Sequence, residues 1–143
     1  MPEPFARRIR APSAPEAPGA TWSNALLIGD EIAISGVTAR GADGRAMGGD
    51  SMRDQTLAIF ERIDALVTAA GGVRGSIYKL VIYVTDIARK DEVNAARRAF
   101  FSPAFPCSTL VEVKGLVFPD LLVEVDAFAN RRVDLNAPAM AEA

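Results

Sequence analysis

The segment PCSTLVEVKGLVFPDLLVEVDAFAN, residues 106–130, decides the fold of this chain. Mostly apolar residues recur at every second position on both sides of a central interruption. This period of two predicts two half-buried strands. Thr109, Val111 and Val113 share one face of the first strand, and Leu121, Val123, Val125 and Ala127 share one face of the second. Gly115 and the run Phe118-Pro119-Asp120 break the pattern. The two strands therefore either turn back on each other or connect across a sheet.

Glu124 stands in the middle of the second strand. A carboxylate among apolar residues is desolvated unless it faces water or a partner, so we expect its pKa to be raised. Such a group could act as a general acid or base. Alternatively, Glu112, Glu124 and Asp126 simply line the wet face of a sheet, and spacing alone favours this bland interpretation.

Composition limits the chemistry that the chain can perform. With 143 residues we expect a single domain, residues 1–143, with a core of about 25–130 between an irregular lead-in and a frayed tail. The 16 basic and 18 acidic residues are interspersed, so a nucleic-acid partner is disfavoured. The chain has no histidine and one cysteine, Cys107, which excludes histidine-dependent catalysis, histidine metal sites and intrachain disulfides. We therefore predict no metal site.

No segment is long and apolar enough to suggest a membrane span or a secretory signal, so we expect no membrane partner and a cytoplasmic location. The glycine-rich residues 37–50 fit neither a phosphate-binding loop nor a dinucleotide fingerprint. We accordingly predict that the protein needs no cofactor.

The remaining pattern predicts an α+β domain. Two short strands, 25–28 and 31–35, surround a turn at Gly29-Asp30, and a helix runs from a capping signal at Ser51 to Gly71-Gly72. Residues 76–85 form a central strand with Tyr78, Leu80, Ile82 and Val84 on one face. A second helix, about 91–101, turns Val93, Ala96 and Phe100 inward. The result is a mixed sheet of about six strands with two helices on one face, whose apolar second face should pack against other subunits.

The order and spacing of several short motifs resemble the RidA/YjgF (Rid) family over roughly residues 25–130. These motifs are Ile34-Ser35-Gly36, Gln55-Thr56, Ala70-Gly71-Gly72, KLVIYVTD at 79–86, Asn94, Ala99-Phe100-Phe101, Pro106 and VEVDA at 123–127. The resemblance implies a chorismate-mutase-like fold and a homotrimer with a central barrel and small-molecule pockets between subunits. It also implies cofactor-independent hydrolysis of enamines or imines to keto acids and ammonia.

Site residues follow from the same resemblance. Glu124 matches the glutamate that orients the attacking water, Asn94 and Gly36 match residues near the pocket, and Trp22 falls near an aromatic residue that closes it. The arginine that grips the substrate carboxylate in deaminating members is replaced by Ser108, next to Cys107, which we interpret as a pocket wall. One hydroxyl cannot reproduce a bidentate guanidinium contact, so we expect altered substrate specificity.

Lys114, Arg97 or Arg98 could replace the missing arginine, although solvated surface charge is the favoured interpretation for all three. Two functions remain open. The first is a RidA-like hydrolase, a deaminase in which Glu124 activates water; the second is a non-catalytic trimeric module that binds a metabolite or a protein. Nuclease activity, sometimes attributed to the family, is the least favoured because the chain is acidic and lacks histidine.

Overall fold

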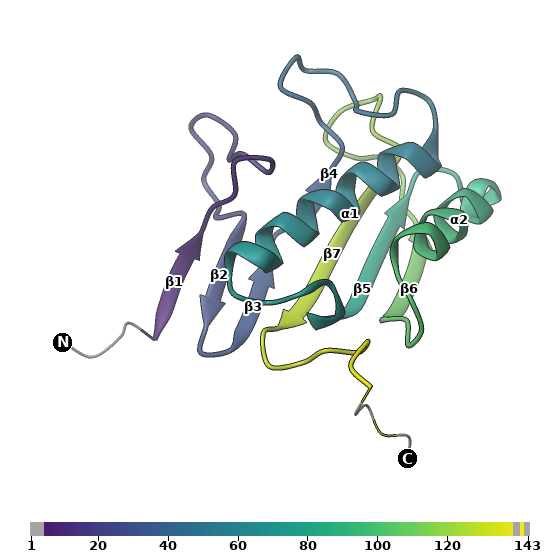
Figure 1. Cartoon of the computed structure of the whole chain (residues 1–143). Coiled ribbons are helices and arrows are strands. Elements are labelled where there is room, and N and C mark those ends of the chain that lie inside the picture. The colour runs from purple at the N-terminus through teal and green to yellow at the C-terminus, as the bar shows by residue number, and fades with distance from the viewer. Residues whose placement is uncertain (1–4, 139–140, 142–143) are drawn as a thin grey trace.

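The computed structural model describes residues 5–138 and residue 141. In this part of the chain a seven-stranded mixed sheet carries two helices on one face (Figure 1), as the sequence predicts. The strands are β1 (Ala6–Ile9), β2 (Ala25–Ile28), β3 (Glu31–Ile34), β4 (Val37–Thr38), β5 (Ile77–Val84), β6 (Cys107–Glu112) and β7 (Val123–Asn130). The helices are α1 (Met52–Ala69) and α2 (Lys90–Phe100), with short 3-10 turns η1 (Arg74–Ser76) and η2 (Ile87–Arg89). The strand order is β1-β2-β3-β7-β5-β6, and β4 also pairs with β7.

The two strands of the segment 106–130 connect across the sheet rather than forming a hairpin. Strand β5 lies between them, parallel to β6 and antiparallel to β7. Strand β7 is half-buried as predicted, whereas β6 lies at the sheet edge and only Leu110 is partly buried. The prediction of a half-buried first strand is therefore wrong for the single chain, because β6 has a neighbour on one side only.

The core fills the space between the helices and one face of the sheet. Every second residue of β7 is buried there, facing the same side as the buried residues of β5. Under the helices, the ring of Phe60 packs against those of Phe100 and Phe101 at centroid distances of 5.4 and 5.1 Å. Aromatic contacts at this spacing add to the free energy gained from apolar burial. The sheet consequently has one covered and one open face.

Both helices begin and end close to the predicted positions. Ser51 caps α1, since its side chain accepts a hydrogen bond from the backbone N–H of Asp54 at 3.0 Å. The chain leaves α1 at Gly71, whose φ of 91° is one that glycine adopts readily. In α2 the inward residues Val93, Ala96 and Phe100 are buried as predicted.

Strands β1 and β4 and the start of β5 differ from prediction, and β4 is a short strand that the sequence does not predict. The lead-in contributes an additional strand, β1, which pairs antiparallel with β2. A β-bulge between Ile77 and Lys79 puts Ile77 into the core, and Tyr78 instead reaches Glu31 with a 2.8 Å hydrogen bond to Oε1. The extra residue of the bulge reverses the alternation there, so the prediction that Tyr78 shares a face with Leu80 is wrong.

The open face of the sheet, opposite the helices, carries exposed apolar side chains. Ile28, Val111 and Phe128 are 39%, 41% and 39% exposed. These exposed apolar side chains are compatible with packing against another subunit, and the predicted burial of this face stays a prediction. Among the described residues, no helix has the length and apolar character needed to cross a membrane.

Candidate functional site

Glu124 lies on the open face of the sheet, and its side chain is half-buried. Its neighbours along β7, Val123 and Val125, are buried under the helices, so Glu124 points the other way. It pairs with Tyr83 of β5 and Thr38 of β4. Strands on both sides therefore fix the backbone that carries this carboxylate.

Two effects raise the pKa of Glu124. Partial burial disfavours the charged form first, and the negative charge of Asp126, two residues along the same face, adds to it. Asp126 in turn accepts a 2.9 Å hydrogen bond at Oδ2 from the hydroxyl of Tyr83, which raises the pKa of that phenol. The raised pKa of Glu124 agrees with the sequence-based expectation. Such a carboxylate can accept a proton near neutral pH more readily than an exposed one.

Gly36 adjoins this carboxylate, and its lack of a side chain makes room for it. A Cβ at position 36 would lie 2.5 Å from Oε1 of Glu124 and 3.2 Å from Oδ1 of Asp126. The segment is held in place nearby, because the N–H of Ser35 donates to the carbonyl of Asn24 at 2.9 Å. The structure thus brings together two of the residues that the resemblance placed at the pocket, Glu124 and Gly36.

A second group of site residues gathers at the sheet edge, between α2 and β6. There a cavity of about 360 Å³ is lined by Asn94, Arg97, Arg98, Phe105, Pro106 and Ser108. Nη1 of Arg97 donates a 2.7 Å hydrogen bond to Oγ of Ser108. The pKa of Arg97 is lowered by burial. Arg97 is therefore only partly solvated, and its guanidinium group is hydrogen-bonded to Ser108.

These two groups do not meet within one chain. Ser108 pairs with the buried Leu80 and lies on the helix side of the sheet, whereas Glu124 lies on the open side. Strand β5 also separates β6 from β7. A site that uses Glu124 together with Ser108 therefore requires two copies of the chain.

The other two predicted site residues lie elsewhere. Cys107 is exposed at the start of β6, and it is not among the residues that line the cavity beside Ser108. Trp22 is 51% exposed in the segment that precedes β2. Their roles at a pocket remain predictions.

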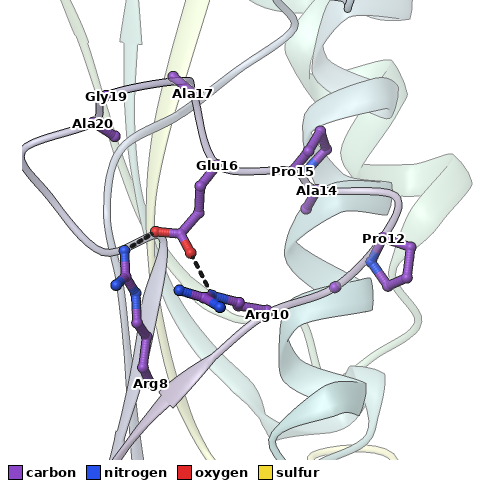
Figure 2. A pocket seen from close by; sticks show the side chains of 10 residues that line it. Arg8, Arg10, Pro12, Ala14, Pro15, Glu16, Ala17, Gly19 and Ala20 are labelled. Carbon is purple, nitrogen blue, oxygen red and sulfur yellow. Dashed lines mark hydrogen bonds and ion pairs between the residues drawn. The ribbon is translucent and has the colours of Figure 1, made fainter.

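A larger cavity of about 690 Å³ lies beside the lead-in, lined by Arg8, Arg10, Glu16 and small residues between them (Figure 2). Glu16 forms ion pairs with both arginines, that with Nε of Arg10 at 2.9 Å, and the ion pair with Arg8 is the first cause of its lowered pKa. None of the predicted site residues lines this cavity. Because both of its arginines are already paired with Glu16, it is a weaker candidate than the other two groups.

No group of three or more acidic or cysteine side chains gathers as metal ligands do within residues 5–138. The polar groups near Glu124 and Ser108 are instead carboxylates, hydroxyls, an amide and guanidinium groups.

Residues 11–131 match the family model described as Endoribonuclease L-PSP. Solved structures similar to this chain include named members of the Rid and YjgF families. The chain therefore belongs to the Rid/YjgF family, and the resemblance seen in its sequence is confirmed.

The similar proteins range from one of unknown function to a named deaminase. A protein of unknown function from Pseudomonas aeruginosa is 49% identical, with a TM-score of 0.84 over 92% of this chain and 96% of that one. The RutC family protein of Aquifex aeolicus is 32% identical over 77% of this chain and 88% of that protein. The 2-iminobutanoate/2-iminopropanoate deaminase of Salmonella typhimurium is 38% identical, but over only 51% of this chain and 59% of that enzyme.

Proposed function

We propose that the protein is an atypical Rid-family hydrolase that deaminates an imine or enamine metabolite with a water molecule activated by Glu124. The observation that carries this proposal is the half-buried carboxylate of raised pKa on the open face of the sheet. Names of relatives add support, since several are called 2-iminobutanoate/2-iminopropanoate deaminases. A nuclease reaction has less support, because the chain is acidic and contains no histidine.

The reaction needs one base and one water molecule. Glu124 accepts a proton from water as the oxygen attacks the carbon of the C=N bond, which gives a tetrahedral carbinolamine. Glu124 returns this proton to the nitrogen, and the hydroxyl proton of the adduct also passes to the nitrogen as the C=O bond forms and the C–N bond breaks with loss of ammonia. For 2-iminobutanoate the products are 2-oxobutanoate and ammonia, so atoms and charge balance without a redox step.

The complete site would form between subunits of a trimer. The edge that carries Ser108 and Asn94 would meet the open face that carries Glu124 of the next copy. Such a contact joins two different surfaces, and head-to-tail contacts of this kind close into rings when the rotation allows. The exposed apolar residues of the open face support this assembly.

The main alternative is a trimeric module that binds a metabolite without turnover. It is favoured by Ser108, which stands where deaminating members have the arginine that grips the substrate. In this alternative Glu124 would be a ligand-binding or structural carboxylate. The two functions differ in whether replacement of Glu124 abolishes a reaction.

The test measures hydrolysis of 2-iminobutanoate, formed in the assay by an amino-acid oxidase, with semicarbazide trapping the imine that remains. We expect Glu124→Gln to lower the catalysed rate by about 100-fold or more, since a positioned general base contributes roughly 100- to 10,000-fold. Glu61→Gln, at an exposed position of α1, is the matched control and should leave the rate unchanged. The wild-type rate should rise with pH through the raised pKa of Glu124, because only the carboxylate form accepts the proton.

A wild-type rate no higher than the uncatalysed rate, on this substrate and on other imines and enamines of small carboxylic acids, would favour the binding module. Equal rates for wild type and Glu124→Gln would remove Glu124 from the mechanism.

A further inference from the structure

We infer that Arg97, held in place by Ser108, is the anion-binding group of this site and that it holds the carboxylate of a small organic acid. Helix α2 thus supplies, through Arg97, the cation that position 108 of strand β6 lacks. This inference treats the cavity between α2 and β6 as part of the proposed active site, and it rests on the proposed function to that extent.

The helix position of Arg97 and one hydrogen bond define where its side chain lies. It lies one turn after Asn94 on α2, so both side chains project over β6 and line the same cavity. Its Nη1 donates to Oγ of Ser108 at 2.7 Å. Arg98 lines the cavity too, but it is exposed to solvent. Arg97 is therefore the guanidinium group with a defined place in the cavity.

The charge of Arg97 is not neutralised by any acid in the described part of the chain. Its hydrogen-bond partner is the uncharged hydroxyl of Ser108, and its buried Nε has no hydrogen-bond partner there. Arg89, near the start of the same helix, shows the usual arrangement, since its Nε lies 2.6 Å from Oε2 of Glu92. A partly desolvated cation without a carboxylate attracts an anion more strongly than a solvated one.

The lining of the cavity indicates what kind of anion fits. It combines the amide of Asn94 and two guanidinium groups with the apolar rings of Phe105 and Pro106, and it contains no acidic residue. A volume of about 360 Å³ lies at the small end of ligand pockets, which are typically about 300–1,000 Å³. A planar carboxylate matches the fork of a guanidinium, and a short apolar chain would lie against Phe105.

Calorimetry with 2-oxobutanoate and its uncharged analogue 2-oxobutanamide tests this inference. We expect the wild-type protein to prefer the keto acid by at least about tenfold, as charge-assisted hydrogen bonds predict. Arg97→Met should lose this preference by weakening the binding of the acid and not of the amide. Arg132→Met removes an arginine that is 79% exposed at its side chain, and this matched control should bind like wild type.

Two gentler variants test the same contact without removing the bulk of the side chain. Arg97→Lys keeps the charge but not the fork, and Ser108→Ala removes the acceptor that fixes the guanidinium. We expect each to lower the preference for the acid several-fold. The inference is overturned if the wild type shows no preference for the acid or if Arg97→Met retains the full preference. It is also overturned if the two single variants Arg97→Lys and Ser108→Ala both retain the full preference.

The same measurements separate this inference from the proposed function. Glu124→Gln should bind the keto acid at least as tightly as wild type while losing turnover. A wild type that binds the acid through Arg97 but releases no ammonia would refute the hydrolase and leave the anion-binding role intact.

Discussion

The absence of a side chain at Gly36 leaves room for the Glu124 carboxylate. Gly36→Ala would place a methyl group 2.5 Å from Oε1 of Glu124, so the carboxylate, as the flexible end of its side chain, must move. The backbone of Gly36 does not have a positive φ, so alanine fits its conformation. Because small displacements of catalytic groups are costly, we expect kcat to fall by about tenfold or more while Tm changes by only a few degrees.

Gly115→Ala is the control for this prediction, since a Cβ at position 115 has no heavy atom within 4 Å. It should leave both kcat and Tm near wild type. An unchanged kcat for Gly36→Ala would show that the position of the Glu124 carboxylate is unimportant for the reaction.

At this scale the sequence predicts some site features and misses others. The raised pKa of Glu124 follows from a carboxylate within an apolar strand, a local pattern that is visible in the sequence. The contact between Arg97 and Ser108 joins a helix to a strand, and no local pattern encodes its geometry. The available signal was the spacing of Asn94 and Arg97, three residues apart on one helix, which places them on the same face.

Among the elements, helix α1 is attached to the rest of the fold by a buried glutamine. Nε2 of Gln55 donates to the carbonyls of Gly49 and Asp120 at 2.7 and 2.9 Å, and its Oε1 accepts from the N–H of Leu122 at 2.9 Å. The side chain thereby connects the start of α1 to the residues that lead into β7, the strand that carries Glu124.

Gln55→Leu should strongly destabilise the protein. The substitution removes three hydrogen bonds to part-buried backbone groups, and each such bond contributes roughly 0.5–1.5 kcal/mol. We expect an overall loss of about 2–4 kcal/mol in the free energy of unfolding, measured by chemical denaturation. Arg53→Leu, at an exposed position two residues earlier, is the control. A loss below about 1 kcal/mol for Gln55→Leu would mean that water or a neighbouring group replaces these bonds.

The sheet explains which elements the sequence could predict. Helices α1 and α2 and strand β7 bury one face fully, so their periodicity is strong and their positions were predicted closely. Strand β1 was missed because three of its four residues are exposed and it lacks alternation. The sequence does not decide the pairing of β5 between β6 and β7, since both connections satisfy the same pattern of apolar residues.

For the molecule as a whole, the exposed apolar residues of the open sheet face predict that subunits associate through this face. Val111→Glu would put a charge on this face at a residue that is 41% exposed in the single chain. If the face is buried between subunits, an unpaired charge there costs several kcal/mol, and light scattering should show single chains in place of trimers. Val73→Glu, at a residue 51% exposed after α1, should leave the trimer intact. A Val111→Glu protein that remains trimeric would place the subunit contacts elsewhere.

The central claim is that one copy of the chain supplies Arg97 and the next supplies Glu124 to the same site. Mixing the variants Arg97→Met, which should bind the substrate weakly, and Glu124→Gln, which should not turn it over, tests it most directly. In trimers reassembled at random from equal amounts of both, about one site in four would combine the intact Arg97 of one copy with the intact Glu124 of its neighbour.

We therefore expect the reassembled preparation, assayed at a substrate concentration well below KM, to recover about a quarter of the wild-type rate of 2-iminobutanoate hydrolysis. Arg97→Met alone should retain about a tenth or less of that rate, and Glu124→Gln alone should stay near the uncatalysed rate. Light scattering and mass spectrometry would verify that mixed trimers have formed. A mixed preparation no more active than the sum of its two parents would contradict the account, because it would mean that the two residues do not meet across a subunit boundary.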